Sequence, residues 1–241
     1  MPISHSRTRI KICGLTRESD VDAAVAAGAD AIGFVLYAPS PRSVSLERAV
    51  TLSCRLPPYV TPVLLFVNEE STKIRAACEA IPSCILQFHG DETPAQCLEV
   101  TATPSGHRPF VRAARIPLSG DTLGINLVEY AQHYSQAQAI LLDAHVQGYG
   151  GGGHAFNWSL LPPNVNAHLV LSGGLTPANV TDGILQVRPR GYSLAVDVSS
   201  GVEATDSEGR PLKGIKDAGK IQRFIAAVRA ADAQLALHSD V

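Results

Sequence analysis

Two neighbouring glycine- and serine-rich segments near the end of the chain have residue types suited to holding a phosphate group. Residues 172–175 (SGGL) and 197–202 (DVSSGV) each come at the end of a short apolar run. Glycines let the backbone approach an anion closely, and free N–H groups at the start of a helix favour negative charge. One such segment is often only a tight turn. Two in succession predict a site for a phosphorylated small molecule.

Two residues that can transfer protons, Cys13 and Asp143, also come at the ends of apolar runs. Cys13 precedes Gly14, and Asp143 ends residues 139–143 (AILLD). A thiolate can act as a base, and a carboxylic acid can donate a proton. The alternatives are a small buried side chain for Cys13 and a helix cap or an ion pair for Asp143. A buried, purely structural role is predicted for the other cysteines, which are Cys54, Cys78, Cys84 and Cys97.

Other polar residues in these segments are open to two interpretations. Arg42, in residues 40–43 (SPRS), is either a site residue or a solvated charge, and His89 is either a site residue or a satisfied core histidine. Asp91 and Glu92 are interpreted as the polar start of a helix, and no spacing of His, Asp and Glu predicts a metal site. Residues 148–153 (GYGGGG) form either a closing lid or a passive linker.

The elements that must position these residues alternate along the chain. Continuous apolar runs, typical of strands covered on both faces, occur at residues 9–13, 31–36, 61–67, 85–89, 110–116, 139–143, 168–172 and 193–198. Helical patterns occur at residues 17–28, 45–56, 71–81, 94–100, 122–136, 177–187 and 216–231, with a short turn at 157–161. Gly28 is predicted to cap the first helix.

This alternation predicts an α/β fold, a single-domain (β/α)₈ TIM barrel. An open doubly wound sheet alternates in the same way, but no Gly-x-Gly-x-x-Gly follows the first run. One domain is expected over residues 1–241, with the barrel at about 9–231, surface loops at 101–109 and 203–212, and a frayed tail at 232–241. The chemistry of such barrels lies at the carboxyl ends of the strands, where the candidate residues fall.

The composition excludes several classes of function. The 241 residues carry 20 Lys and Arg against 22 Asp and Glu, a formal net charge of −2 that offers no cationic field to a nucleic acid. No apolar run approaches the length of a membrane span and the start of the chain has no secretory signal, so we expect a cytoplasmic protein with no membrane partner. Five cysteines without Cys-x-x-Cys predict reduced thiols.

Six short segments at successive strand ends carry a family pattern. They are residues 11–16 (KICGLT), 40–42 (SPR), 87–90 (QFHG), 142–143 (LD), 172–175 (SGGL) and 196–203 (VDVSSGVE). Together, in this order, they resemble the phosphoribosylanthranilate isomerases of tryptophan biosynthesis over about residues 9–229. The resemblance implies an Amadori rearrangement of N-(5'-phosphoribosyl)anthranilate to 1-(2-carboxyphenylamino)-1-deoxyribulose 5-phosphate on a (β/α)₈ barrel, with no cofactor.

The resemblance also implies a role for individual residues. Cys13 matches the general base of the family and Asp143 its general acid, with the pKa of the thiol lowered towards neutrality and that of the carboxyl raised. Arg42 matches the contact to the anthranilate end, and His89 and Asp197 match residues that line the site. The phosphate contacts match Gly173, Gly174, Ser199 and Ser200.

Two segments depart from the family pattern, and two other functions stay open. Residues 150–158 (GGGGHAFNW) replace the usual Gly-Gly-Thr-Gly and Phe-Asp-Trp, and the segment after Glu203 is longer than usual. Another phosphate-handling barrel, such as indole-glycerol-phosphate synthase or ribulose-phosphate epimerase, would need a lysine acid or a metal cluster, and neither is seen. A catalytically silent barrel that binds a phosphorylated metabolite would not need Cys13 and Asp143. Both a monomer and a homodimer agree with the sequence.

Overall fold

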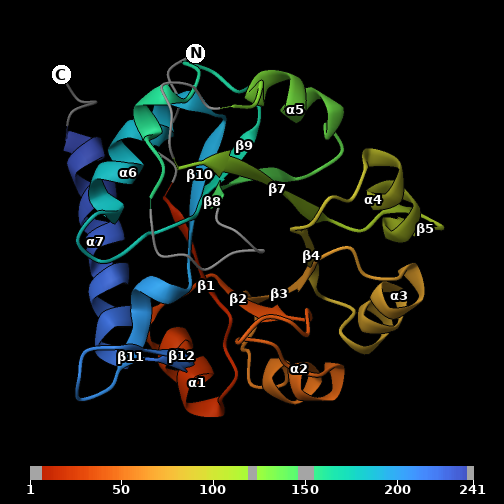
Figure 1. Ribbon diagram of the computed structural model, residues 1–241, viewed down its shortest axis with the longest axis horizontal. Helices are drawn as coiled ribbons and strands as arrows, with labels where there is room; N and C mark the ends of the chain where they lie inside the picture. Colours follow the sequence, from red (N-terminus) through yellow and green to blue (C-terminus); the bar gives the residue numbers. More distant parts are fainter. Residues whose placement is uncertain (1–6, 119–123, 146–154, 238–241) are drawn as a thin grey trace.

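The chain folds into a closed barrel of parallel strands surrounded by helices (Figure 1). The computed structural model describes residues 7–118, 124–145 and 155–237. Within them the barrel strands are β1 (Arg9–Cys13), β2 (Ala31–Val35), β3 (Thr61–Phe66), β4 (Ile85–Phe88), β7 (Phe110–Pro117), β8 (Ala139–His145), β9 (His168–Leu171) and β10 (Ser193–Val198). They pair in the order β1-β10-β9-β8-β7-β4-β3-β2, and β2 pairs with β1 to close the ring. The predicted fold class is confirmed.

The helices follow the strands and surround the barrel in chain order (Figure 1). They are α1 (Glu18–Ala27), α2 (Leu46–Ser53), α3 (Ser71–Ala80), α4 (Pro94–Thr101), α5 (Leu127–His133), α6 (Val180–Val187) and α7 (Ala218–Leu237). Short 3₁₀ turns are η1 (Trp158–Leu160), η2 (Arg188–Arg190) and η3 (Ser200–Val202). In the described part of the β8–β9 connection, η1 occupies the position where the sequence predicted a short turn.

Local sequence signals set the ends of several helices. Gly28 ends α1 with a φ of 96°, and its N–H donates to the Val25 carbonyl at 3.0 Å. A left-handed residue at this position is the usual helix stop, and glycine adopts it without steric cost. At the start of α4, the Thr93 and Gln96 side chains cap each other's backbone N–H groups. The prediction that Gly28 caps the first helix is therefore confirmed.

Side chains alternate between the helix layer and the barrel interior along each strand. On β1, Ile10 and Ile12 are fully buried in the apolar cluster that also contains residues of α1 and α7. Lys11, the residue between them, points into the barrel interior, where its Nζ donates a hydrogen bond to Oε1 of Gln87 of β4 at 2.8 Å. The strands are thus apolar towards the helices and partly polar towards the barrel axis, which places ionisable groups in the interior.

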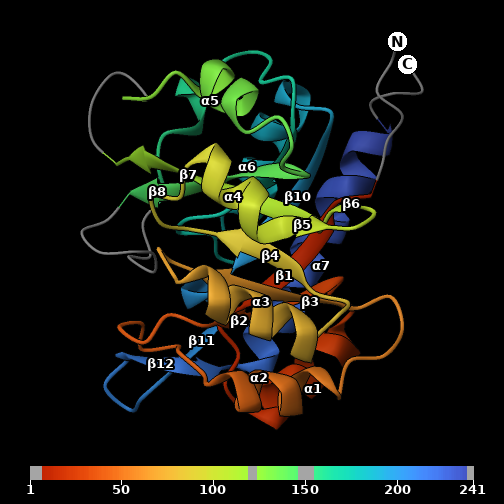
Figure 2. The ribbon, with the colours of Figure 1, turned by 90° about the vertical axis from the view of Figure 1, so that its right-hand side faces the viewer.

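Two segments expected to be surface loops contain β-hairpins. Strands β5 (Ala102–Thr103) and β6 (Gly106–His107) pair after α4, and β11 (Glu203–Thr205) pairs with β12 (Pro211–Lys216) after β10. The Asp206 carboxylate caps the second turn by accepting N–H groups of Glu208 and Arg210 at 2.9 Å each. Figure 2 shows the hairpins at opposite ends of the barrel, with β11–β12 on the side where the barrel strands end.

The last helix continues past the boundary expected from the sequence. Helix α7 extends to Leu237, so residues 232–237 are helical rather than frayed. The reason is Asp232, whose carboxylate accepts the N–H of Thr8 and an N–H of Arg188, both at 2.9 Å. These bonds tie the helix to the residue that precedes β1. Residues 238–241 lie outside the described part of the chain.

The predictions for the structural cysteines had mixed outcomes. Cys78, Cys84 and Cys97 are buried as predicted, but Cys54 is exposed because it lies at the surface end of α2.

None of the described helices combines the length and the apolar character needed to cross a bilayer. Within the described ranges no cluster of three or more His, Cys, Asp or Glu side chains could hold a metal ion. Residues 148–153, interpreted as a lid or a linker, lie outside the described residues.

Candidate active site

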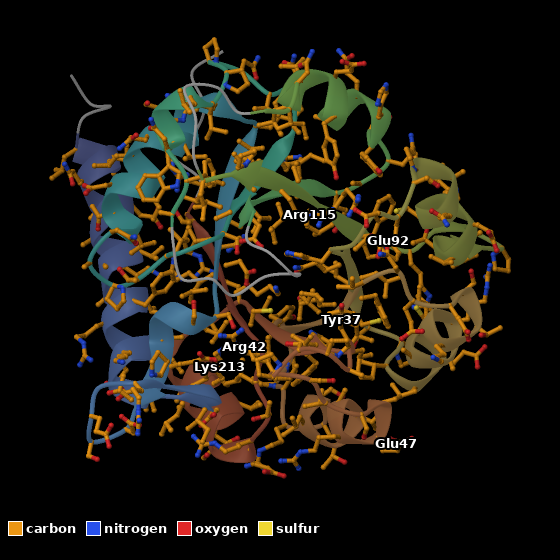
Figure 3. The ribbon with its side chains drawn as sticks, in the orientation of Figure 1. Tyr37, Arg42, Glu47, Glu92, Arg115 and Lys213 are labelled. Atoms are coloured by element: carbon orange, nitrogen blue, oxygen red, sulfur yellow. The ribbon has the colours of Figure 1, made fainter. Side chains whose placement is uncertain are left out.

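The carboxyl ends of the barrel strands bring five polar residues to the same end of the barrel. Cys13 ends β1, Asp143 and Asp197 lie near the ends of β8 and β10, and His89 and Ser172 follow β4 and β9 directly. All five side chains are buried. Figure 3 shows that this end also carries Arg42 and Lys213 on one side and Glu92 and Arg115 on the other.

Cys13 fits into space that two glycines leave open. Gly33, its register partner on β2, is so close that a Cβ there would lie 2.7 Å from Sγ of Cys13 and 2.9 Å from Cε of Lys11. Gly14 has a φ of +72°, and a Cβ there would lie 2.7 Å from Cδ of Arg42. Only glycine fits at both positions without displacing these side chains. The thiol therefore has a narrowly defined position, with 5% of Cys13 exposed.

The charges around Cys13 do not lower its pKa as the sequence predicted. Burial raises the pKa of the Cys13 thiol, and the nearby Asp197 carboxylate adds to this. The Lys11 and Lys216 ammonium groups act in the opposite direction but do not outweigh the loss of solvent. The shift is thus opposite in direction to the one expected from the sequence, and Lys11 and Lys216 are the two cations in place to stabilise the anion once it forms.

Asp143 and His89 form a hydrogen-bonded pair. Nε2 of His89 lies 2.8 Å from Oδ2 of Asp143, and Nδ1 of the same ring lies 3.0 Å from the amide nitrogen of Gln87. The other carboxylate oxygen faces the turn after β9, because a Cβ on Gly173 would lie 2.9 Å from Oδ1 of Asp143. Sequence analysis left a core role open for His89. The structure places it against the carboxylate.

Lys11 is a site residue that sequence analysis did not single out. Its Nζ donates to Oε1 of Gln87 at 2.8 Å and to Oδ1 of Asp197 at 3.0 Å. Burial lowers the pKa of Lys11, but attraction to Asp197 and Cys13 outweighs that effect and raises it above its usual value. Lys11 therefore carries its charge, and the ion pair is desolvated. Oδ2 of Asp197 accepts a bond from Ser172 at 3.3 Å.

Arg42 is a buried ion-pair partner rather than a solvated charge. It is 7% exposed, and its Nε and Nη2 donate to the two carboxylate oxygens of Glu203 at 2.6 and 2.9 Å. Burial pushes the pKa of Glu203 up, but the bonds from Arg42, the charge of Lys216 and the N–H of Gly214 together hold it below its usual value. The β11–β12 hairpin thus fixes the direction of Arg42.

The two predicted phosphate segments lie against each other, and Lys216 links the second of them to Glu203. A Cβ on Gly201 would collide with the Leu175 carbonyl, so the turn after β10 packs directly on the turn after β9. Lys216 donates to the carbonyl and hydroxyl of Ser199 at 2.9 and 3.2 Å, and burial lowers the pKa of this lysine to about 8.

The helix after the first phosphate segment starts later than the sequence predicted, because α6 begins at Val180 rather than at residue 177.

The four predicted phosphate residues have backbone conformations suited to tight turns. Gly173 and Gly174 have φ values of 75° and 65°, and Ser199 and Ser200 begin the η3 turn. At Gly173 a Cβ would also collide with the Ala144 backbone. This glycine is therefore required by its contact with β8, besides any contact with a ligand.

A second buried pair supports the turn that carries His89. Arg112 of β7 donates to the carbonyls of Phe88 and Gly90 at 3.0 Å each and pairs with Glu92 at 3.2 Å. Glu92 in turn accepts the N–H of Gly90 at 2.9 Å. Glu92 thus braces the turn after β4, a role that sequence analysis did not foresee when it interpreted this residue as the polar start of a helix.

A parallel eight-stranded barrel with its polar groups gathered at the strand ends defines the chain as a (β/α)₈-barrel protein. Residues 10–227 match the family described as PRAI, N-(5'phosphoribosyl)anthranilate (PRA) isomerase. The chain is 60% identical over 230 residues to the N-(5'-phosphoribosyl)anthranilate isomerase of Methylibium petroleiphilum, covering 95% of this chain and 98% of that protein. It is 58% identical over 234 residues to that of Leptothrix cholodnii, covering 97% and 96%.

Solved structures agree with these relatives. The phosphoribosyl anthranilate isomerase of Thermotoga maritima superposes with a TM-score of 0.76 at 38% identity, covering 92% of this chain and 99% of that one. A phosphoribosyl anthranilate isomerase solved with reduced 1-(o-carboxyphenylamino)-1-deoxyribulose 5-phosphate gives 0.73 at 36%, with the same coverage. Monomers generated from the dimeric Thermotoga maritima protein give 0.72 at 36%, again covering 92% and 99%.

The chain therefore belongs to the N-(5'-phosphoribosyl)anthranilate isomerase family. It is an isomerase of tryptophan biosynthesis, as the six segments predicted. Membership of this family removes the alternative of an unrelated phosphate-handling barrel.

Proposed function

We propose that this chain isomerises N-(5'-phosphoribosyl)anthranilate to 1-(2-carboxyphenylamino)-1-deoxyribulose 5-phosphate, with Asp143 as general acid and Cys13 as general base. One observation carries the assignment of the two roles. The two side chains are buried at the same end of the barrel interior, on β1 and β8, and Lys11, Gln87 and His89 connect them. This arrangement leaves the substrate between a proton donor and a proton acceptor.

The first step opens the furanose ring. Asp143 gives a proton to the ring oxygen while the bond between that oxygen and C1 breaks, and the anthranilate nitrogen supplies electrons to form a protonated imine. Nε2 of His89 lies 2.8 Å from Oδ2 of this carboxyl and holds it in position. A donor fixed in position in a buried site lowers the barrier without reorganising water.

The second step removes the hydrogen on C2. The imine cation acidifies this hydrogen, and the Cys13 thiolate takes it to give an enolamine. Burial raises the pKa of the thiol, so formation of the thiolate costs free energy that Lys11, Lys216 and the imine cation offset. The C2 hydroxyl then loses a proton while C1 gains one, which yields the ketone. Substrate and product have the same atoms and the same oxidation level, and no cofactor takes part.

The remaining site residues bind and orient the substrate. Arg42 binds the anthranilate carboxylate through Nη1, which lies outside its pair with Glu203. His89 and Asp197 line the site beside the reacting carbons. Gly173, Gly174, Ser199 and Ser200 hold the phosphate, and Lys216, bonded to Ser199, adds positive charge there. Charge-assisted hydrogen bonds of this kind contribute binding and orientation rather than bond making.

The protein acts in the cytoplasm as a monomer or a homodimer, and its partner is the phosphorylated small molecule rather than a nucleic acid or a membrane. The composition and the family support this setting. The dimeric relative and its monomeric forms support both states.

Turnover of the purified protein and of two variants tests the roles. Cys13→Ser and Asp143→Asn should each lower kcat by about 10²-fold or more, because each removes one partner of a proton transfer. Cys54→Ser and Asp22→Asn, at exposed positions, serve as matched controls. Both active-site variants should still bind the reduced product analogue. A Cys13→Ser or Asp143→Asn protein as active as its control would refute the corresponding assignment.

A further inference from the structure

One chain of buried hydrogen bonds runs through the barrel interior from β10 to β8. Asp197 accepts from Lys11 at 3.0 Å, and Lys11 donates to Oε1 of Gln87 at 2.8 Å. The amide nitrogen of Gln87 lies 3.0 Å from Nδ1 of His89, and Nε2 of His89 lies 2.8 Å from Oδ2 of Asp143. The side chains come from β1, β4, β8 and β10. The chain ends on the proposed general acid.

The chemistry of the first member fixes the direction of the others. A lysine ammonium has only donors, so the oxygen of the Gln87 amide must face Lys11. The NH₂ group of that amide then faces Nδ1 of His89, which must accept. In a neutral imidazole the single ring proton is then on Nε2, where it is donated to Asp143. Each bond in the chain is satisfied in this one arrangement of protons.

This arrangement has a consequence for the carboxyl group of Asp143. Oδ2 accepts the His89 proton, so a proton that Asp143 carries sits on Oδ1. Oδ1 faces the turn after β9, as its 2.9 Å approach to a Cβ on Gly173 indicates. With the ring proton on Nδ1 instead, Nε2 would become an acceptor and would compete with the substrate for the carboxyl proton.

We propose that Gln87 is a positioning residue that keeps His89 in the Nε2–H tautomer and so directs the acidic proton of Asp143 to Oδ1. Lys11 holds the Gln87 amide in the required orientation. Gln87 acts through His89 and touches neither the substrate nor the acid. The proposal rests on the proposed role of Asp143 only for its effect on turnover, because the tautomer itself is a property of the free protein.

The tautomer can be measured directly in the unaltered protein. With ¹⁵N-labelled histidine, the nitrogen shifts and their coupling to ring protons distinguish a protonated from a bare Nδ1. The His89 signals are assigned by their loss in His89→Gln. We expect a protonated Nε2 and a bare Nδ1 in the wild type. A protonated Nδ1 in a neutral His89 ring would overturn the proposal, whatever the variants do.

Two substitutions at Gln87 then separate positioning from packing. In Gln87→Glu the carboxylate accepts a proton from Nδ1, so Nδ1 should become protonated. In Gln87→Leu the ring has no partner at Nδ1, so a mixture of tautomers should appear. Both should lower kcat by about tenfold with little change in KM, the size typical of losing a group that orients a functional histidine.

The control is Gln222→Glu, the same change on the exposed face of α7. It should leave kcat, KM and the His89 signals unchanged. Thermal unfolding of every variant shows whether it is folded under the assay conditions. Folded Gln87→Glu and Gln87→Leu proteins with the kcat of this control would overturn the proposal.

Failure of this proposal can be distinguished from failure of the proposed function. If Asp143→Asn keeps normal turnover, Asp143 is not the acid, and the tautomer measurement still reports on Gln87. If Asp143→Asn is impaired while the Gln87 variants are not, the acid stands and the positioning role is refuted.

Discussion

Lys11 of β1 and Asp197 of β10 are register partners in the parallel sheet, and their side chains form an ion pair of 3.0 Å inside the barrel. Both side chains are buried, so this pair is desolvated. Desolvated pairs add little to stability by themselves but are costly to break, since removal of one partner leaves the other uncompensated. The pair places a fixed ammonium beside Cys13, which ties the fold to the proposed chemistry.

Gly33→Ala should damage catalysis through Cys13. The new Cβ would lie 2.7 Å from Sγ of Cys13 and 2.9 Å from Cε of Lys11, and both side chains must move. Overpacking of this kind costs about 1–3 kcal/mol of stability, and a displaced base should lower kcat. Gly219→Ala in α7 is the control, because its Cβ meets only side-chain atoms, those of Arg223 and Asp217 at 3.2 Å, and no part of the active site. Denaturant unfolding and turnover assays measure both effects, and wild-type kcat and stability for Gly33→Ala would contradict the packing described.

Glu203→Ala should destabilise the protein and weaken substrate binding. Its loss leaves Arg42 and Lys216 without their carboxylate, and breaking a buried pair in this way costs about 3–5 kcal/mol. Glu203→Gln keeps an acceptor and should cost less. Because the hairpin no longer orients Arg42, KM should rise more than kcat falls. Glu208→Ala, at the exposed tip of the same hairpin, should change stability by less than about 0.5 kcal/mol. Equal unfolding free energies for Glu203→Ala and Glu208→Ala would contradict the ion-pair assignment.

The sequence predicted the strands well because each one has the same environment. The run 31–36 was found to within one residue of β2, since a strand between helices and a barrel interior is apolar almost throughout. The hairpin β11–β12 was missed because its pairing depends on Glu203 and Lys216, two charged residues that are stable inside the protein only as partners. Polar composition suggested a solvated loop.

The candidate site was only partly accessible from the sequence. Lys11 and Gln87 are polar residues inside apolar runs, each two positions before a candidate, Cys13 and His89, and two positions is the spacing that puts side chains on one face of a strand. That signal was present and could have identified both. The partner of Arg42 was not accessible, because Glu203 lies 161 residues further along the chain and only the folded barrel brings them together.

The dependence of kcat/KM on pH should reflect the raised pKa of Cys13. Burial shifts this pKa upwards, so the thiolate fraction in the free enzyme grows as the pH rises above neutrality. Since kcat/KM reports on groups of the free enzyme, and the reaction needs the Cys13 thiolate together with a protonated Asp143, the profile should be bell-shaped with limbs that belong to the pair. One limb should vanish in Cys13→Ser, because a serine hydroxyl does not ionise in this range. A Cys13→Ser profile with both limbs of the wild type would argue against a thiol base.

Lys216 should make stability rise with pH on the alkaline side. Burial lowers its pKa in the folded protein to about 8, below its value in the unfolded chain. Above about pH 8 the unfolded state binds more protons than the folded state, so the free energy of unfolding increases with pH until the unfolded lysine also loses its proton. The gain amounts to at most about 3 kcal/mol. Lys216→Met should lack it, whereas Lys213→Met, exposed on the same strand, should keep it. If the free energy of unfolding depends on pH in the same way in both variants, the lowered pKa of Lys216 is refuted.

The division of labour between Cys13 and Asp143 is tested most directly by a deuterium isotope effect. Single-turnover rates are compared for substrate carrying hydrogen or deuterium on C2, in Cys13→Ser and in Asp143→Asn. If Cys13 is the base, its serine variant should be slowed about 10²-fold or more and show a primary isotope effect, because C2–H removal then limits the rate. Asp143→Asn should be slowed with little isotope effect, because ring opening limits it. A Cys13→Ser enzyme with a near-normal rate, or one slowed without an isotope effect, would contradict the account.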